Sequence, residues 1–369
     1  MATIEDHIRA VEDEIGRTQY NKHTQHHIGK LKAKLARLKD EQEKRQARGK
    51  GGGGAQYAVR KSGNATIGLV GFPSTGKSTL LNAITAATSE VGAYDFTTIE
   101  IIPGLLEYKG AKIQILDMPG IIRGASKGRG RGREVISVAR VCDLVLLMVD
   151  VFETNVPVLA DELYSAAIRL NGRPPDVVIK KRMRGGLTIN ATVPLTKIPV
   201  ETISDMVREF GYLSGDVVVR QDIAQDDLVD VLAGNRVYIP AIVVLNKIDL
   251  VGGDYLREVG KRLDGWKVVP ISAAKGEGLD RLKEEIYRGL KFIRIYLKPH
   301  GKEADLVEPL IVKSGSTVGM VCDAIHRDIR QKFRFANVWG RSATHPGQRV
   351  GLEHVLEDED MLTLISRHR

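Results

Sequence analysis

"GFPSTGKS", residues 71 to 78, matches the pattern G-x-x-x-x-G-K-[S/T]. The apolar run ATIGLVG precedes it and predicts a buried strand, and a helix is expected to start near Lys77. Glycines allow backbone N–H groups to close around phosphate, and the helix N-terminus adds its positive dipole. The stretch therefore predicts a phosphate-binding loop after a strand, with Lys77 neutralising the β- and γ-phosphates.

Strand-like and helix-like segments alternate on either side of this loop. Strands are expected at 99 to 108, 112 to 116, 144 to 149, 241 to 246 and 267 to 272, and helices near 133 to 140, 156 to 170, 254 to 264 and 278 to 291. Such alternation is typical of a mainly parallel, doubly wound α/β sheet. A ligand is expected at the carboxyl ends of its strands.

A magnesium site is expected beside the loop. The Ser78 hydroxyl is a metal ligand in this pattern, and DMPG (117 to 120) ends a predicted strand about 40 residues later. Asp117 is expected to hold Mg²⁺ through water, and the Gly120 N–H to meet the γ-phosphate. In YDFTT (94 to 98), Thr98 is the first choice for a switch threonine that ligates Mg²⁺; spacing does not separate it from Thr97.

NKID (246 to 249) ends another predicted strand and indicates guanine. Asp249 can accept two hydrogen bonds from guanine N1–H and its 2-amino group, and adenine leaves this carboxylate unpaired. Asn246 is expected to tie the loops together, and the stem of Lys247 to pack over the base. SAA (272 to 274) follows the next strand, and the Ala273 amide is expected to reach guanine O6. GTP is therefore favoured over ATP.

The residue after DMPG is Ile121, where Ras-like enzymes have a glutamine that orients the attacking water. Isoleucine cannot do this, so slow intrinsic hydrolysis accelerated by a partner is the working hypothesis. Its rival is an adaptor that binds and exchanges GTP with negligible hydrolysis. The arginines that follow could contact RNA, supply an internal arginine finger, or form a solvated switch: Arg123, Arg129, Arg131 and Arg133.

Residues 1 to 50 predict a helical hairpin. Ile4, Ile8, Val11 and Ile15 form one apolar stripe, and Ile28, Leu31, Leu35 and Leu38 form another. The second helix is otherwise basic, which suits either a solvated face or an arm that contacts phosphates: Lys30, Lys32, Lys34, Arg37, Lys39, Lys44, Arg45, Arg48 and Lys50. GKGGGGAQ predicts a flexible tether, so this arm is expected to move.

Two further segments depart from the strand–helix alternation. Residues 173 to 237 predict a small α+β insertion: a hairpin around Gly185 and Gly186, a helix, a strand and a helix. KKRMR (180 to 184) near the hairpin tip suits RNA contact or a plain charged turn. After about Arg294, a strand, a second strand, a helix and a closing strand predict a compact mixed-sheet module.

Composition bounds the partners. The net charge of +9 favours polyanions, with nucleic acid first and anionic membrane second, although a generally basic surface fits equally well. Cys142 and Cys322 lie in apolar settings and are expected in the core of a protein from a reducing compartment. No signal peptide or membrane span is expected, and the predicted location is cytoplasmic.

GFPSTGKSTLLNAIT, YDFTT, DMPGIIRGASKGRGRGRE and NKID together resemble the developmentally regulated GTP-binding proteins (DRG), in the Obg branch of translation-factor-like GTPases. The C-terminal part resembles their TGS domain, a ubiquitin-like β-grasp fold, and the insertion resembles their α/β module. The resemblance implies a GTPase that contacts ribosome, rRNA or tRNA through the basic hairpin and the TGS-like domain, without a membrane. A stabilising regulatory protein is a further partner that it implies.

The resemblance also implies that the missing glutamine is compensated by a potassium ion near the β- and γ-phosphates, by a group from elsewhere or by activation on the ribosome. Relatives that hold potassium most clearly have asparagine where this chain has Ser74. The expected cofactors are GTP or GDP, Mg²⁺ and K⁺. Lys77, Thr98 and Gly120 are the expected catalytic residues, and Ser78, Thr98 and Asp117 the metal ligands. The expected nucleotide contacts are Gly71, Phe72, Pro73, Ser74, Thr75, Gly76, Lys77, Ser78, Thr79, Asn246, Lys247, Asp249, Ser272, Ala273 and Ala274.

The resulting fold class is α/β: a P-loop GTPase domain with an N-terminal helical hairpin, a small α+β insertion and a C-terminal β-grasp domain. The predicted boundaries are hairpin 1–50, linker 51–63, first GTPase part 64–172, insertion 173–237, second GTPase part 238–293 and TGS-like domain 294–369.

Overall fold

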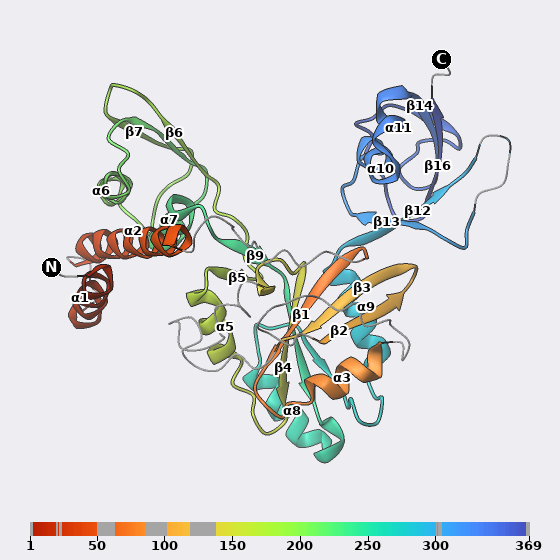
Figure 1. Cartoon of the computed structure of the whole chain (residues 1–369), viewed down its shortest axis with the longest axis horizontal. Coiled ribbons are helices and arrows are strands. Elements are labelled where there is room, and N and C mark those ends of the chain that lie inside the picture. The colour runs from red at the N-terminus through yellow and green to blue at the C-terminus, as the bar shows by residue number, and fades with distance from the viewer. Residues whose placement is uncertain are drawn as a thin grey trace. The chain divides into compact units, whose positions relative to one another are not determined.

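The computed structural model describes residues 3–19, 21, 24–49, 63–85, 102–118, 138–299, 301 and 305–366. Thr97, Thr98, Gly120, Ile121 and the four arginines after Ile121 lie outside these ranges, so their predicted roles stay predictions. The chain divides into two compact units, whose helices and strands are labelled in Figure 1. Unit 1 combines Met1–Ala58 with Ala167–Tyr238, and unit 2 combines Val59–Ala166 with Ile239–Arg369.

A six-stranded sheet organises unit 2, in the order β11-β10-β4-β1-β3-β2. Five strands are parallel, and β2 at the edge runs antiparallel to β3. The strands are β1 (Ala65–Gly71), β2 (Ile102–Tyr108), β3 (Ala111–Asp117), β4 (Leu144–Asp150), β10 (Ala241–Asn246) and β11 (Val268–Pro270). The predicted mainly parallel α/β sheet is confirmed.

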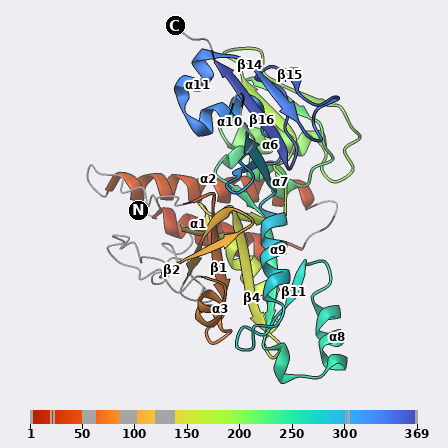
Figure 2. The same ribbon diagram turned by 90° about the vertical axis from the view of Figure 1, so that its right-hand side faces the viewer.

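Helices cover this sheet because its central strands are apolar on both faces. β1 and β4 are buried at all seven positions, as expected for strands inside a parallel sheet. Figure 2 shows α3 (Lys77–Ile84) and α9 (Leu279–Gly289) beside the sheet. Leu80 and Leu81 of α3 and Leu282 and Ile286 of α9 share one core cluster with Ile67 and its neighbours. Among the described residues of the GTPase part, α5 (Val156–Ser165) and α8 (Gly253–Arg262) are two further helices.

The helix predicted for 156 to 170 is too long. α5 ends at Ser165, and Ala167 adopts a left-handed conformation with φ of 66°. The chain then continues as the short strand β5 (Ile168–Leu170), which pairs with β9 (Val237–Ile239). Ala167 breaks the helix because a left-handed residue cannot continue right-handed helical geometry.

In unit 1, α1 (Ile4–Arg17) and α2 (Gln25–Gly49) pack as the predicted hairpin. Val11, Leu31 and Leu38 form their buried contact, with Ile8, Ile15 and Leu35 around it. The Thr3 hydroxyl accepts from the Asp6 amide and caps the start of α1. The two predicted apolar stripes thus meet along the hairpin.

The insertion is a three-stranded sheet with α6 (Val200–Glu209) and α7 (Gln225–Ala233). Its strands are β6 (Val177–Lys181), β7 (Leu187–Ala191) and β8 (Gly215–Val219), in the order β6-β8-β7. The hairpin predicted around Gly185 and Gly186 is therefore wrong, because β6 and β7 are not neighbours. β8 takes the centre because it supplies the buried Val217 and Val219, whereas β6 and β7 are partly exposed.

The basic helix α2 is built into this insertion, so the hairpin is not an arm separate from it. Residues 50–56 of the predicted tether lie outside the described residues, so the predicted movement relative to the GTPase domain stays a prediction. Ala33 and Ala36 belong to the same core cluster as Ile203 and Met206 of α6. A Cβ on Gly29 would lie 2.9 Å from Thr202 Cγ2, so α2 and α6 approach closely. Several cations of α2 pair with carboxylates: Lys30 with Asp205 (2.7 Å), Lys32 with Asp226 (2.8 Å), Arg37 with Glu209 (3.4 Å) and Lys39 with Glu12 (2.8 Å).

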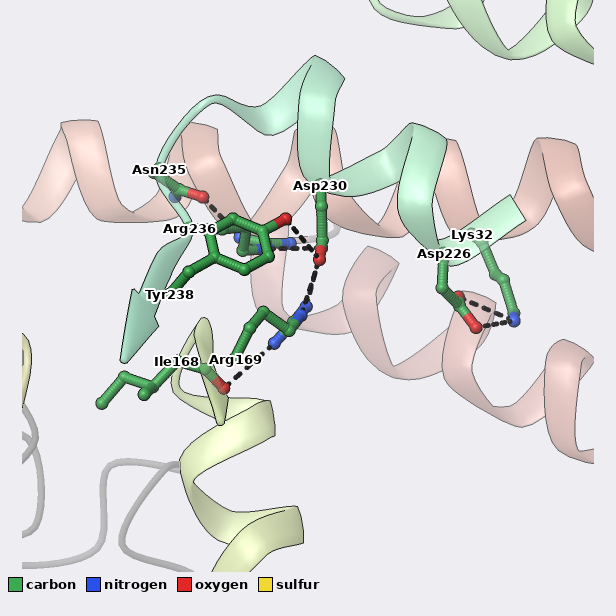
Figure 3. A network of polar contacts seen from close by, with 8 residues as sticks. All are labelled: Lys32, Ile168, Arg169, Asp226, Asp230, Asn235, Arg236 and Tyr238. Atoms are coloured by element: carbon green, nitrogen blue, oxygen red, sulfur yellow. Dashed lines mark hydrogen bonds and ion pairs between the residues drawn. The ribbon is translucent and has the colours of Figure 1, made fainter. Parts of the chain in front are cut away.

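A buried carboxylate connects α7 to the β5–β9 pair (Figure 3). Asp230 accepts from Arg169 Nε at 2.6 Å and Nη2 at 2.7 Å, and from Arg236 Nε at 2.9 Å. The Tyr238 hydroxyl lies 3.5 Å from the same carboxylate. Burial raises the pKa of Tyr238 to about 12, and the charge of Asp230 adds to the shift, so this phenol stays protonated at neutral pH.

The C-terminal module contains a five-stranded sheet in the order β13-β12-β16-β14-β15, consistent with the predicted β-grasp fold. Its elements are β12 (Phe292–Leu297), β13 (Leu310–Lys313), α10 (Val318–Ile325), α11 (Arg327–Lys332), β14 (Phe333–Trp339), β15 (Gln348–Val350) and β16 (Asp360–Ser366). β12 and β16 run parallel, and the other pairs run antiparallel. The sequence did not predict β14, β15 or α11. In the parts of the chain that the structure describes, no helix is long and apolar enough to span a bilayer.

Candidate nucleotide-binding site

The predicted motifs meet at one edge of the six-stranded sheet. β1, β3, β4 and β10 end at Gly71, Asp117, Asp150 and Asn246, and their parallel pairing places these ends together. Asn246 and Asp150 are direct neighbours across β10 and β4. The loops that leave these strands therefore surround a common space, as expected for an open α/β sheet.

The phosphate loop depends on two glycines that tolerate no side chain. A Cβ on Gly71 would lie 2.3 Å from the Met148 carbonyl oxygen. Gly76 caps α3 with φ of 93°, and a Cβ there would lie 2.5 Å from Asn246 Nδ2. Ser74 also has a positive φ, of 62°, and the Thr75 hydroxyl donates to the Phe72 carbonyl at 2.9 Å. Pro73, Ser74 and Thr79 are exposed.

Lys77 occupies the inside of this loop. Its ammonium donates to the carbonyls of Phe72 at 2.9 Å and Gly71 at 3.2 Å. Burial lowers the pKa of Lys77, and the carboxylate of Asp117 partly opposes that shift. The loop thus holds one half-buried cation among backbone groups that can reorganise around phosphate oxygens.

A serine and a carboxylate lie side by side where magnesium is expected. Ser78 Oγ donates to Asp117 Oδ2 at 2.9 Å. The other oxygen, Asp117 Oδ1, is buried and has no hydrogen-bond partner among the described residues. Within those residues, no three His, Cys, Asp or Glu side chains gather as metal ligands. One hydroxyl and one carboxylate fit Mg²⁺, which keeps several waters and takes phosphate oxygens as ligands.

Asn246 joins the phosphate loop to the SAA loop. Its Nδ2 donates to the Thr75 carbonyl at 2.9 Å, and its Oδ1 accepts from the Ala273 amide at 3.0 Å. The Ala273 amide therefore does not point at a free acceptor, contrary to the expectation that it meets guanine O6. The buried Asn246 oxygen takes that hydrogen bond. Ala274, the next residue, is exposed.

Asp249 lies in a short 3₁₀ turn, Ile248–Leu250, after Lys247 in a left-handed conformation. Its pKa lies below the ordinary value, chiefly because the Ser272 side chain hydrogen-bonds to it, with a contribution from Lys275. Lys275 Nζ lies 3.6 Å from Asp249 Oδ2. Asp249 is thus an ionised acceptor, the form that two guanine N–H groups require.

Asp150 is a site residue that the sequence analysis missed. Its Oδ2 lies 2.5 Å from Lys247 Nζ, and its Oδ1 accepts from the amides of Phe152 at 3.0 Å and Glu153 at 2.9 Å. Burial raises the pKa of Asp150, but these hydrogen bonds outweigh it and leave the pKa below its ordinary value. An aspartate that ends a buried strand was the available signal, the same one that identified Asp117.

Comparison with known proteins agrees with this geometry. Family models match the 50S ribosome-binding GTPase over residues 66–181, the C-terminal region of that GTPase domain over 184–292, and the TGS domain over 293–366.

Relatives match this chain over nearly its whole length. The chain is 56% identical to a GTP-binding protein of Methanocaldococcus jannaschii over 98% of this chain and 93% of that protein. It is 45% identical to ribosome-interacting GTPase 1 of Saccharomyces cerevisiae over all of both chains, and 43% identical to developmentally-regulated GTP-binding protein 1 of Xenopus laevis over 98% of each. The chain therefore belongs to the family of GTP-binding proteins that join a ribosome-binding-type GTPase domain to a C-terminal TGS domain.

Proposed function

We propose that this protein hydrolyses GTP to GDP and phosphate and acts as a ribosome- or RNA-associated switch in translation. Within its family we place it with the developmentally regulated GTP-binding proteins of the Obg branch. The name of the Saccharomyces cerevisiae relative, ribosome-interacting GTPase 1, supports the association with ribosomes. A stabilising regulatory protein is a second proposed partner.

The observation that carries the proposal is the contact between Ser78 and Asp117 beside Lys77. The hydroxyl and the carboxylate lie 2.9 Å apart, and the second carboxylate oxygen is buried without a partner. Such an oxygen is costly unless something binds it. Bound Mg²⁺ would neutralise charge on the phosphates here. Lys77 would exchange two carbonyl contacts for phosphate oxygens, while Thr98 and Gly120 are proposed to complete the γ-phosphate contacts.

Guanine selection is proposed for the residues of the NKID and SAA segments. Asp249 accepts from guanine N1–H and the 2-amino group, and adenine would leave this ionised group unpaired. Because Ala273 N is used by Asn246, the amide of Ala274 is the proposed donor to O6. Lys247, held by Asp150, is the proposed cover for the base.

Hydrolysis is proposed to be slow without a partner, because Ile121 cannot orient water. Potassium near the phosphates or contact with the ribosome would supply the missing charge or geometry. An arginine finger, which acts similarly, contributes roughly 10³ to 10⁵ in rate in other GTPases. Ser74 is exposed and could offer its hydroxyl oxygen to potassium. The rival function is a ribosome-binding adaptor without meaningful hydrolysis.

Phosphate release from GTP tests the proposal. The full chain is measured with and without purified ribosomes, in potassium and in sodium buffers, beside the Lys77→Ala variant as background. We expect release well above that background, increased by ribosomes, by potassium or by both. Nucleotide binding with release equal to that of Lys77→Ala under every condition would establish the adaptor instead.

A further inference from the structure

The sheet of the C-terminal module has one face outside its core. Side chains alternate along strands. The core side holds Ile293, Ile295, Ala336, Val338, Val350 and Leu362. The register shift between Phe333 and Phe335 turns the rest of β14 so that Phe335 and Trp339 lie on the other side. Tyr296 and Arg349 share that side, because their strand neighbours Ile295 and Val350 are buried in the core.

Cations lie directly on these aromatic rings. The guanidinium carbon of Arg349 lies 3.7 Å from the centroid of the Phe335 ring. Lys298 Nζ, just after β12, lies 4.7 Å from the centroid of the Trp339 ring. Both distances are within the range of cation–π attraction. The Arg349 guanidinium therefore lies against the Phe335 ring.

The cations next to the aromatic rings on this face have no acidic partner among the described residues. In the described part of the chain, no carboxylate lies within ion-pair distance of Lys298 or Arg349. Arg294, near the start of β12, differs because Asp358 and Glu359 each lie 2.7 Å from its guanidinium. The patch of Lys298, Phe335, Trp339 and Arg349, here called the stacking patch, is therefore both aromatic and cationic.

We propose that the stacking patch binds single-stranded RNA. Unpaired bases stack on aromatic rings and on guanidinium planes, and neighbouring cations neutralise the phosphates. Phe335 and Trp339 are four residues apart on one strand, about 13 Å, so the patch offers two separate stacking positions along an extended chain. An acidic peptide would pair with the cations but would leave the rings unused. The choice of RNA over DNA rests on the proposed ribosomal function. The expectation that bases stack on the patch does not depend on that function.

Trp339 provides a local readout in the full-length chain. The protein has two tryptophans, so a Trp266→Phe background leaves Trp339 as the only one. An unstructured uridine oligomer is titrated while the Trp339 emission and its salt dependence are recorded. We expect saturable quenching, because a base comes into contact with the indole. In the same background, Arg349→Gln is expected to weaken binding about tenfold and to lower the salt slope by about one.

Matched variants separate this patch from other basic surfaces. Arg257→Gln removes an equal charge from α8, away from the patch, and should leave RNA affinity unchanged. Phe335→Leu tests stacking without changing the charge. The thermal transition of this variant reports whether it folds. If it does not fold, Arg349→Gln remains the decisive variant, because Arg349 is exposed. Three results would overturn the proposal. A deoxyuridine oligomer could bind more tightly than the uridine oligomer, or an acidic peptide could reproduce the quenching. The third is equal RNA affinity of the Arg349→Gln and Arg257→Gln variants. GTP turnover of the same samples reports separately on the proposed function.

Discussion

Asp150 and Lys247 show how a residue outside the nucleotide motifs can shape the site. Asp150 fixes the Lys247 ammonium at 2.5 Å and is itself held by two backbone amides. Lys247 has a positive φ of 64°, so its side chain starts from an unusual backbone position. The ion pair therefore defines where the lysine stem lies before the base arrives. We therefore propose Asp150 as a positioning residue for guanine recognition.

Replacing Asp150 with asparagine tests this role. The variant keeps the shape but removes the charge, and a hydrogen bond to a charged group contributes about 1.5–3 kcal/mol. We expect the affinities for GTP and GDP to fall together by roughly tenfold or more. Calorimetric titration measures both, and Asp254→Asn on exposed α8 is the control for charge. A loss confined to GTP would place the effect at the γ-phosphate and contradict the assignment.

At the residue scale, the sequence predicted side chains whose chemistry follows from a motif at a strand end. Asp117, Asn246 and Asp249 lie at one sheet edge because the register of parallel strands brings their ends together. The use of the Ala273 amide could not be predicted, because Asn246 and Ala273 meet only once both loops are folded. Asp150 carried the same strand-end signal as Asp117 but belongs to no short motif.

At the scale of elements, the sequence again predicted features that depend on neighbouring residues and missed features that depend on contacts between distant segments. The buried strands of the main sheet are local apolar runs, so their positions and their mainly parallel pairing were predictable, whereas the antiparallel direction of the edge strand β2 was not predicted. The order β6-β8-β7 was not, because two short, partly exposed strands say little about which neighbour each one chooses. Ala33 and Ala36 of α2 were missed for a related reason. A small residue in a basic helix marks a packing surface only when the facing helix is known.

Two aspartates on α7 provide a paired test of the contact between this helix and the β5–β9 strands (Figure 3). Asp230 is 7% exposed and bonded to Arg169 and Arg236, whereas Asp226 pairs with Lys32 at the surface. Breaking a buried pair leaves uncompensated charge and costs about 3–5 kcal/mol. An exposed pair contributes about 1 kcal/mol or less.

We therefore expect Asp230→Asn to lower the urea midpoint of unit 1 strongly, and Asp226→Asn to change it little. Circular dichroism during urea unfolding measures both variants beside the unmodified chain. Equal midpoints for the two variants would mean that the two guanidinium groups find other partners when Asp230 loses its charge.

The whole molecule consists of two compact units, and all the described nucleotide-site residues lie in unit 2. The basic hairpin, by contrast, shares its core with the insertion in unit 1. Part of the positive charge of the hairpin is neutralised within unit 1, because Lys30, Lys32 and Arg37 pair with carboxylates of the insertion. Deleting the hairpin to test RNA binding would thus also uncover the insertion core. Exposed Lys34 is a cleaner position for removing charge from this helix.

Nucleotide binding is expected to stabilise unit 2 alone. A ligand at one hundred times its Kd adds about 2.7 kcal/mol to the state that binds it. For a unit of this size, that corresponds to roughly 5–10 °C in Tm. Scanning calorimetry of the full chain with and without GDP and Mg²⁺ should show one transition that moves and one that does not. Truncation to residues 51–369 removes Ala33 and Ala36 from the insertion core. The transition that does not respond to nucleotide should then disappear, which would identify it as the unfolding of unit 1. The Lys77→Ala chain should show no response to nucleotide. A single transition that GDP moves as a whole would show instead that the two units unfold cooperatively.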